Sequence, residues 1–400
     1  MSSISLCFEV HQPFRVRKEV LKGEEDLFNA YFDDKVNREL FERISYKCYY
    51  PATEIILEEI NRFKDEYKKF KVAFSLSGIF LEQCKEYNPG LLDLFRKLAK
   101  SGCVEFLSQT YYHSLAALYE NKDEFISQVE LHRKTIKKLL GTSPVFFENT
   151  ELIFNNVVAS TVEGMGFKGI FSEGVERVLG WRSPNYVYHP FGSDIKVLMR
   201  NYQLTDDVGF RFSARDWKEY PLTAEKYSAW LAGTPGQCIN LFMDYETLGE
   251  HHWPETGIHE FLRFLPGEVL KYDHLEFLTP SEIAEKHAAV GEVDVPEWET
   301  TSWADLERST ACWLSNDMQR ECFDRIKRLD EKVKMLKDKK MLNVWRYLQT
   351  SDHLHHIYTE GGGPGEVHSY FSPCESAVEA FRILDAVLTD FEKRVERKLR

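Results

Sequence analysis

Two glutamates, Glu148 and Glu151, lie where a short apolar run gives way to asparagine-rich sequence in residues 146–156. A carboxylate buried without a partner is strongly unfavourable, so an acid at such a place is paired, neutralised or used in chemistry. The pattern predicts Glu151 as a catalytic nucleophile. From the residues alone, the alternative is that both acids are ion-paired structural groups near a helix N-terminus.

Four more apolar runs end in polar residues. In a parallel β/α barrel the carboxyl ends of the strands converge on one face, where such barrels form their active sites. One cluster alone could be a core histidine or a helix cap, but five together predict a single site. The five clusters contain His11 and Gln12, then His113, Glu151, Asp206, and finally Asp244 with Glu246.

The residue types favour glycoside hydrolysis. A pair of carboxyl groups can attack the anomeric carbon and protonate the leaving oxygen, and aromatic rings can stack on sugars. Trp217 and Trp253 follow two of the acidic clusters, so both could line sugar subsites or could be ordinary packing. The chain has no G-x-G-x-x-G, Walker, H-E-x-x-H or G-x-S-x-G motif, which leaves nucleotide binding, a zincin site and serine hydrolysis unsupported.

Composition narrows the class of protein. The formal net charge of -13 argues against a nucleic-acid partner or an anionic membrane, and favours a neutral or small substrate. The eight cysteines show no C-x-x-C spacing and are predicted to be buried free thiols of a reducing compartment. The N-terminus lacks a basic leader, and no apolar stretch approaches about 18 residues. We therefore expect a cytoplasmic protein with no cofactor and no metal.

Eight short apolar runs alternate with amphipathic helical patterns, which is typical of β/α units and a parallel sheet. A polar connector at 291–299 contains a proline, and helical periodicity dominates from 303 to about 358. A glycine-rich segment, 361–365, is predicted to be a mobile loop before a final helix. The eight runs are 4–10, 71–78, 103–107, the run that precedes Glu148, 167–171, 195–199, 238–243 and 275–278.

These clusters resemble the five characteristic regions of glycoside hydrolase family 57, and more closely its short α-amylase branch. The resemblance spans residues 1 to about 290, and its third, fourth and fifth regions are the most specific. Thr205 stands where serine is common, and both residues carry a hydroxyl. The five regions match His11-Gln12-Pro13, 102–114, Asn149-Thr150-Glu151-Leu152-Ile153, 204–213 and 243–251.

The resemblance implies an α/β fold, an incomplete TIM-like (β/α)7 barrel over residues 1–290. A C-terminal helical domain over 300–400 would pack beside the active site. It also implies a retaining mechanism on α-glucans, with Glu151 as nucleophile and Asp206 as general acid/base. Retention requires two carboxyl groups about 5–5.5 Å apart. The residues expected to bind the sugar or orient the acids are His11, Gln12, His113, Asp244 and Glu246.

Two segments of the C-terminal region, 311–319 and 345–353, resemble sequences that accompany this amylase branch. Trp313 or Asp352 could therefore touch the sugar, although core packing is the alternative. The expected activity is that of an α-amylase on starch, glycogen or maltooligosaccharides. The alternatives are a 4-α-glucanotransferase or branching enzyme, a non-catalytic glucan-binding protein, and a metal-dependent deacetylase or mannosidase on a related barrel. The oligomeric state is not determined by the sequence.

Overall fold

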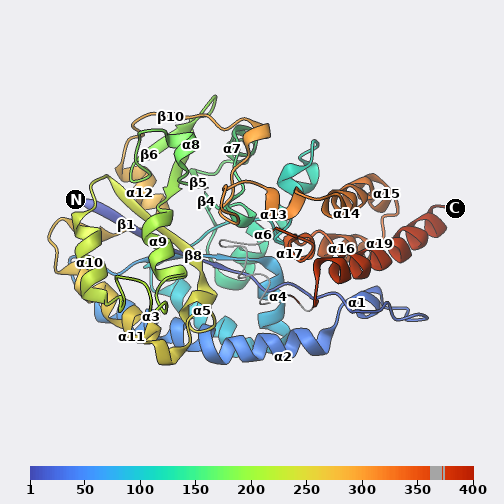
Figure 1. Cartoon of the computed structure of the whole chain (residues 1–400), viewed down its shortest axis with the longest axis horizontal. Coiled ribbons are helices and arrows are strands. Elements are labelled where there is room, and N and C mark those ends of the chain that lie inside the picture. The colour runs from blue at the N-terminus through green and yellow to red at the C-terminus, as the bar shows by residue number, and fades with distance from the viewer. Residues whose placement is uncertain (361–371, 373) are drawn as a thin grey trace.

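A ring of seven parallel strands forms the centre of the molecule, shown in Figure 1 as a computed structural model. The structure describes residues 1–360, 372 and 374–400. Each ring strand corresponds to one of the predicted apolar runs. The ring strands are β1 (Ser2–Val10), β2 (Val72–Leu76), β3 (Val104–Phe106), β4 (Phe146–Phe147), β5 (Gly169–Glu173), β7 (Lys196–Arg200) and β8 (Cys238–Asp244).

Parallel pairing closes the ring. β1 pairs with β2, β2 with β3, β4 with β5, β5 with β7, β7 with β8, and β8 with β1. Ser108 joins β3 to β4, because its N–H donates to Phe146 O at 3.0 Å and its carbonyl accepts from Glu148 N at 2.9 Å. The predicted (β/α)7 barrel is therefore confirmed.

The eighth apolar run forms a strand that stays outside the ring. β9 (Leu275–Phe277) pairs only with Ser2–Ile4 at the start of β1, whereas β2 pairs with Cys7–Val10 at its end. Two short strands were not predicted: β6 (Val187–Pro190) runs antiparallel to β7, and β10 (Glu292–Val293) pairs with β6. β10 anchors the polar connector to the barrel.

Both faces of the ring strands are buried, and the two faces differ in polarity. On β1 the apolar residues alternate with Ser3, Ser5, Cys7 and Glu9, all of them buried. Gln109 donates to Glu9 Oε1 at 2.7 Å from the end of β3, so this polar face points into the barrel. Alternation along a strand in a closed barrel thus separates a packed outer surface from a polar interior.

Helices surround the ring, as Figure 1 shows. α6 ends before Gly141, whose φ of 79° suits a glycine after a helix. The helices of the barrel region are α1 (Leu27–Tyr31), α2 (Asp34–Ile44), α3 (Tyr50–Arg62), α4 (Gly78–Tyr87), α5 (Pro89–Lys100), α6 (Asp123–Leu140), α7 (Asn156–Gly164), α8 (Glu176–Leu179), α9 (Tyr202–Gly209), α10 (Ala224–Gly233), α11 (Ile258–Leu270) and α12 (Pro280–Lys286), with a π-helical turn at Ser45–Tyr49 and 3-10 turns at Ala116–Leu118, Thr150–Leu152, Tyr245–Leu248, Pro254–Thr256 and Glu297–Glu299.

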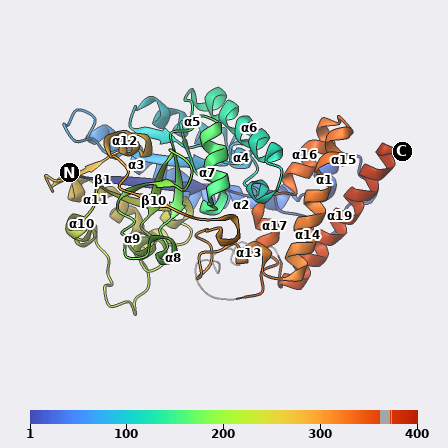
Figure 2. The same cartoon turned by 90° about the horizontal axis from the view of Figure 1, so that it is seen from above.

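The C-terminal region is helical and lies beside the barrel in both views (Figures 1 and 2). It contacts the barrel where Ser351 N donates to His113 O at 2.9 Å, and where Arg346 binds Glu124 through Nε at 2.8 Å. The predicted helical periodicity from 303 fails for the first residues, because α13 begins only at Ala311. The glycine-rich segment 361–365 lies outside the described residues. The C-terminal helices are α13 (Ala311–Leu314), α14 (Asp317–Arg328), α15 (Asp330–Met335), α16 (Lys339–Tyr347), α17 (Ser351–His355) and α19 (Ala377–Leu399).

Candidate active site

A pocket opens at the carboxyl ends of the barrel strands. Seven of the predicted site residues line it, although they come from elements far apart in the sequence. Asp352 reaches it from α17 of the C-terminal region, and the others follow β1, β3, β4 and β8. The pocket is lined by Glu9, His11, Gln12, Pro13, Arg15, His113, Glu151, Asp244, Glu246, His251 and Asp352.

Glu151 sits in a strained turn directly after β4. Its φ is 58° and that of Leu152 is 52°, values that side chains with a Cβ rarely adopt and that cost about 1–3 kcal/mol each. Asn149 Nδ2 braces the turn by donating to Ile153 O at 2.9 Å. Phe154 exchanges two backbone hydrogen bonds with Thr301. The surrounding structure therefore fixes the direction of the Glu151 side chain.

Both carboxylate oxygens of Glu151 have a nitrogen partner. Trp303 Nε1 donates to Oε2 at 2.6 Å, and His113 Nε2 lies 3.3 Å from Oε1. Glu151 is only 3% exposed, so these contacts replace most of its hydration. Hydrogen bonds to a carboxylate stabilise its ionised form, which is the form a nucleophile requires.

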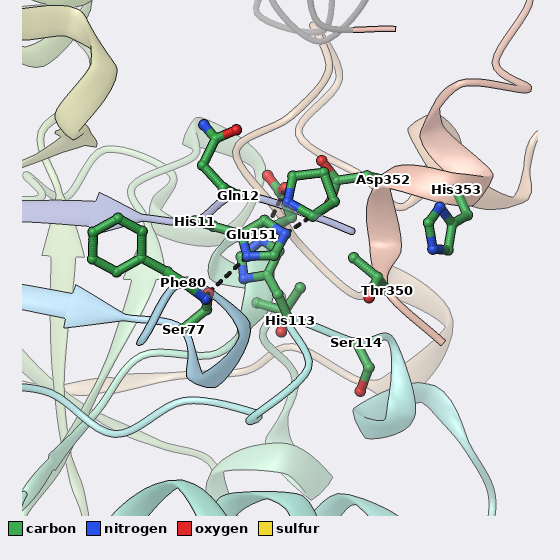
Figure 3. Close-up of polar contacts among 12 residues, drawn as sticks. His11, Gln12, Ser77, Phe80, His113, Ser114, Glu151, Thr350, Asp352 and His353 are labelled. Carbon is green, nitrogen blue, oxygen red and sulfur yellow. Dashed lines mark hydrogen bonds and ion pairs between the residues drawn. The ribbon is translucent and has the colours of Figure 1, made fainter. Parts of the chain in front are cut away.

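Two stacked histidines, His11 and His113, border the nucleophile candidate, with ring centroids 4.1 Å apart (Figure 3). Burial opposes a charge on His113, but its hydrogen bond to Glu151 and the charge of Glu9 raise its pKa to about 9. Burial and the neighbouring His113 lower the pKa of His11 to about 4. Near neutral pH one ring of the stack is therefore charged and the other is neutral.

The hydrogen bonds of His11 indicate its tautomer. Nε2 lies 3.0 Å from Asp352 Oδ2, and Nδ1 lies 2.8 Å from Ser77 Oγ (Figure 3). Because a carboxylate accepts, the neutral ring carries its hydrogen on Nε2, and the Ser77 hydroxyl donates to Nδ1. Asp352 thus holds the ring from the helical region, while Ser77 holds it from the start of α4.

Asp206 lies on α9 and accepts from two arginines. Arg200 Nη2 donates to Oδ1 at 2.6 Å and Arg308 Nη2 donates to Oδ2 at 3.1 Å. Arg200 also binds the buried Glu173 at 2.9 Å. Two guanidinium groups and two carboxyl groups therefore form one cluster of balanced charge, which makes the burial of Asp206 tolerable.

A second cavity lies beside residues that hold the two acids. Asp244 and His251 line both this cavity and the first pocket. Its other walls include Arg200, which binds Asp206, and Trp303, which binds Glu151. The Arg200 guanidinium lies 5.3 Å from the centre of the Trp303 ring. One cavity is thus bordered both by a residue that binds Glu151 and by a residue that binds Asp206.

Glu246 faces the first pocket from the turn after β8. It accepts hydrogen bonds from the Tyr49 hydroxyl and from Gln12 Nε2, the latter at 3.2 Å. Burial and the charge of Asp244 raise the pKa of Glu246 to about 8. A carboxyl group in that state can hold a proton near neutral pH and donate to a hydroxyl-bearing ligand.

Glu9 and Glu148 form a buried pair inside the barrel, below Glu151. Ser75 Oγ donates to Glu148 Oε2 at 2.8 Å, and Leu152 N donates to Glu148 Oε1 at 3.4 Å. Burial raises the pKa of both acids, and the charge of Glu148 adds to the rise for Glu9. Two neighbouring carboxylates repel each other, which favours one shared proton on the pair. Through its bond to Leu152 N, Glu148 therefore supports the turn that carries Glu151.

The structure does not bring the three predicted tryptophans to these pockets. Trp313 is 0% exposed and packs its ring edge-to-face against His355. Trp253 is 54% exposed, with the Lys47 ammonium 4.7 Å from its ring centre. Trp217 lines a separate, larger cavity. The position of Trp313 is therefore one of core packing, which was the alternative named for it.

Sequence reasoning missed the residues that hold the two acids. Trp303 and Arg308 lie in the irregular segment before α13, where periodicity carries no signal, and Arg308 has a φ of 55°. Arg200 was visible as the residue directly after the sixth apolar run, 195–199. Glu9 could have been found, because an acid alternating with apolar residues in a barrel strand must point inward.

Among residues 1–360, 372 and 374–400, no group of three or more His, Cys, Asp or Glu side chains is arranged to hold a metal ion. Both ring nitrogens of His252 have hydrogen-bond partners within the fold, because Nδ1 lies 2.8 Å from Ser213 Oγ and Nε2 lies 3.1 Å from Gly209 O. Within the same described part of the chain, no helix is both long and apolar enough to cross a membrane.

Comparisons with known proteins agree with this architecture. The sequence profile of Glycosyl hydrolase family 57 matches residues 5–296. A protein of Methanocaldococcus jannaschii named "Putative alpha-amylase" is 48% identical over 405 residues, covering 99% of this chain and 85% of that protein. A 4-alpha-glucanotransferase of Thermococcus litoralis is 22% identical over 273 residues, which are 66% of this chain but only 39% of that enzyme.

Among solved structures, a GH57 branching enzyme of Thermococcus kodakaraensis resembles this fold with a TM-score of 0.70. The match covers 98% of this chain and 90% of that enzyme, at 16% sequence identity. At that level of identity, the likeness concerns the fold.

Proposed function

Because the chain belongs to glycosyl hydrolase family 57, we propose that it cleaves α-1,4-glucans as an α-amylase, with retention of the anomeric configuration. One observation carries the proposal: Glu151 and Asp206 are each held by their own donors, and two of these donors, Trp303 and Arg200, line the same cavity. A retaining glycosidase needs two carboxyl groups with different tasks, and different surroundings provide that difference.

In the proposed reaction, Glu151 is the nucleophile. Its carboxylate attacks C1 of the sugar while Asp206 transfers a proton to the leaving oxygen, which gives a glycosyl-enzyme and a shortened glucan. Asp206 then takes a proton from water as that water attacks C1, and Glu151 is released. Trp303 and His113 hold the Glu151 carboxylate in one orientation throughout.

The remaining pocket residues would bind the sugar at the cleavage point. Glu246 and Asp244 present carboxyl oxygens, and Gln12 presents an amide, all suited to hydroxyl groups. His11 is held by Asp352 and stacks on His113, so it contributes both a pocket wall and a fixed orientation. We propose these groups as the substrate-binding set.

Transfer to another glucan in place of water is the second candidate activity. It is favoured by the similarity to the Thermococcus litoralis 4-alpha-glucanotransferase over 66% of this chain. The two acids would act identically up to the glycosyl-enzyme, and a bound sugar hydroxyl would then replace water. The products distinguish the two activities.

Product analysis on maltoheptaose tests the proposal. Shorter oligosaccharides indicate hydrolysis, and longer ones indicate transfer. Glu151→Gln is expected to lower either activity by about 10⁴-fold or more, because the nucleophile is lost while the shape is kept. Unchanged activity in Glu151→Gln would contradict the assignment. Glucan binding without turnover in the wild type would favour a binding protein, and loss of turnover with a chelator would favour metal-dependent chemistry.

A further inference from the structure

A cavity of about 690 Å³, larger than either pocket at the acids, lies along α9. We call it the α9 cleft. Gln203 and Asp207, four residues apart on one face of α9, line it. Tyr202 lies at its edge, on the face that also carries Asp206. The α9 cleft is lined by Gly174, Glu176, Leu179, Trp181, Arg182, Ser183, Pro184, Asn185, Asn201, Tyr202, Gln203, Leu204, Asp207, Trp217, Lys218, Glu219, Trp230 and Thr234.

Three tryptophans from separate segments line the cleft. Trp181 is 95% exposed, directly after α8. Trp217 and Trp230 are half-buried and meet edge-to-face at 6.1 Å. Tryptophan is highly buried on average, and exposed aromatic surface at the rim of a cavity is typical of a binding site. These rings offer flat apolar faces to a ligand.

The polar groups of the cleft suit a neutral ligand rich in hydroxyl groups. Three acids and two bases line it, so its charge is nearly balanced and a phosphorylated or polyanionic ligand gains little from it. The exposed Gln203 adds an amide, which can both donate to and accept from hydroxyls, whereas Asn201 Nδ2 donates to Asn185 Oδ1 at 2.9 Å within the wall. A pyranose ring has apolar C–H faces and a rim of hydroxyl groups, which matches this combination.

We propose that the α9 cleft binds a second stretch of α-glucan chain, outside the site of bond cleavage. That the ligand is an α-glucan rests on the proposed function. The volume of the cleft lies within the roughly 300–1,000 Å³ of pockets for drug-sized molecules, so a short stretch of sugar units fits. The Arg308 guanidinium lies 4.9 Å from the Tyr202 ring centre and also binds Asp206. A polymer held in the cleft is thereby kept close to the acids, which raises its effective concentration there.

Binding of glycogen to the Glu151→Gln protein, measured by affinity electrophoresis, tests the cleft. Trp181→Ala in this background is expected to weaken binding about 3- to 10-fold, the size of an aromatic stacking contribution. Because Trp181 is exposed, its removal leaves the fold intact. Trp298→Ala is the matched control, since that tryptophan is 84% exposed and lies outside the cleft. It is expected to leave glycogen binding unchanged.

Turnover of maltotriose separates the cleft from the active site. With Glu151 intact, Trp181→Ala is expected to cleave this short substrate at the wild-type rate. Unchanged glycogen binding in Trp181→Ala, or an equal loss in Trp298→Ala, would overturn the proposed cleft while leaving the proposed function standing. Glycogen binding that depends on Trp181, in a wild-type protein that neither hydrolyses nor transfers glucans, would support the cleft and overturn the proposed function.

Discussion

Trp303 and Glu151 are joined by two hydrogen bonds across 152 residues of sequence: the indole Nε1 donates to Oε2 at 2.6 Å, and the backbone N–H donates to the carbonyl at 3.3 Å. Five residues further on, Arg308 donates to Asp206 at 3.1 Å. One short irregular segment therefore contacts both acids that we propose to react. Substitutions in this segment test whether the orientation of Glu151 and Asp206 matters for turnover.

Trp303→Phe removes the indole donor and keeps an aromatic ring in place. A hydrogen bond to a charged group contributes about 1.5–3 kcal/mol, so turnover of maltoheptaose is expected to fall roughly 10- to 150-fold. The loss should appear in kcat, because the bond orients the nucleophile. Trp345→Phe is the matched control: it deletes an indole bond to Ile326 O in the helical region and is expected to lower Tm while sparing kcat. Equal effects on kcat would contradict the role of Trp303.

Arg308→Gln removes a positive charge beside Asp206. Arg308 also donates a hydrogen bond that orients the Asp206 carboxyl group, and such a bond to a charged group contributes about 1.5–3 kcal/mol, so kcat on maltoheptaose is expected to fall roughly 10- to 150-fold. The control is Arg211→Gln, which deletes the ion pair to the adjacent Asp207 at 2.7 Å on the same helix. Equal losses of kcat in the two variants would contradict the role of Arg308 in holding Asp206.

Glu148→Gln distinguishes the two acids of the stretch after β4. The neutral amide keeps an oxygen for Leu152 N and can donate toward Glu9, so it imitates the protonated member of the buried pair. Activity is expected to stay within about 10-fold of the wild type, against the loss of about 10⁴-fold expected for Glu151→Gln. If the two substitutions were equally damaging, the choice of Glu151 over Glu148 would fail.

Glu246 is expected to make stability depend on pH. Its pKa is raised from 4.5 to about 8, so the folded protein binds this proton more tightly than the unfolded chain does. The stabilisation is fully present below pH 4.5 and is lost as the pH rises through 8. As the pH rises from 5 to 9, the free energy of unfolding should therefore fall less in Glu246→Gln than in the wild type, by up to several kcal/mol. Urea unfolding at each pH measures this difference. Glu225→Gln, at an exposed position on α10, should follow the wild type.

The sequence by itself predicted the strands of the ring and the end at which polar residues gather. The apolar runs 4–10 and 238–243 marked β1 and β8, and the polar residues after each run were expected on one face. Strand period and parallel connection are local properties, so they can be read from the chain. The family resemblance then selected Glu151 over Glu148, which the residues alone left as equals.

The tertiary structure decided which side chains hold the acids. Trp303 and Arg308 reach them from a segment without periodicity, and the positive φ angles of Glu151 and Arg308 exist only because contacts distant in sequence impose them. It also placed Trp313 in the core, although its type suited a sugar platform equally well. Local patterns determine where a strand runs and which face it buries. Long-range packing decides which irregular segment closes over the end of a strand, and no local pattern encodes that packing.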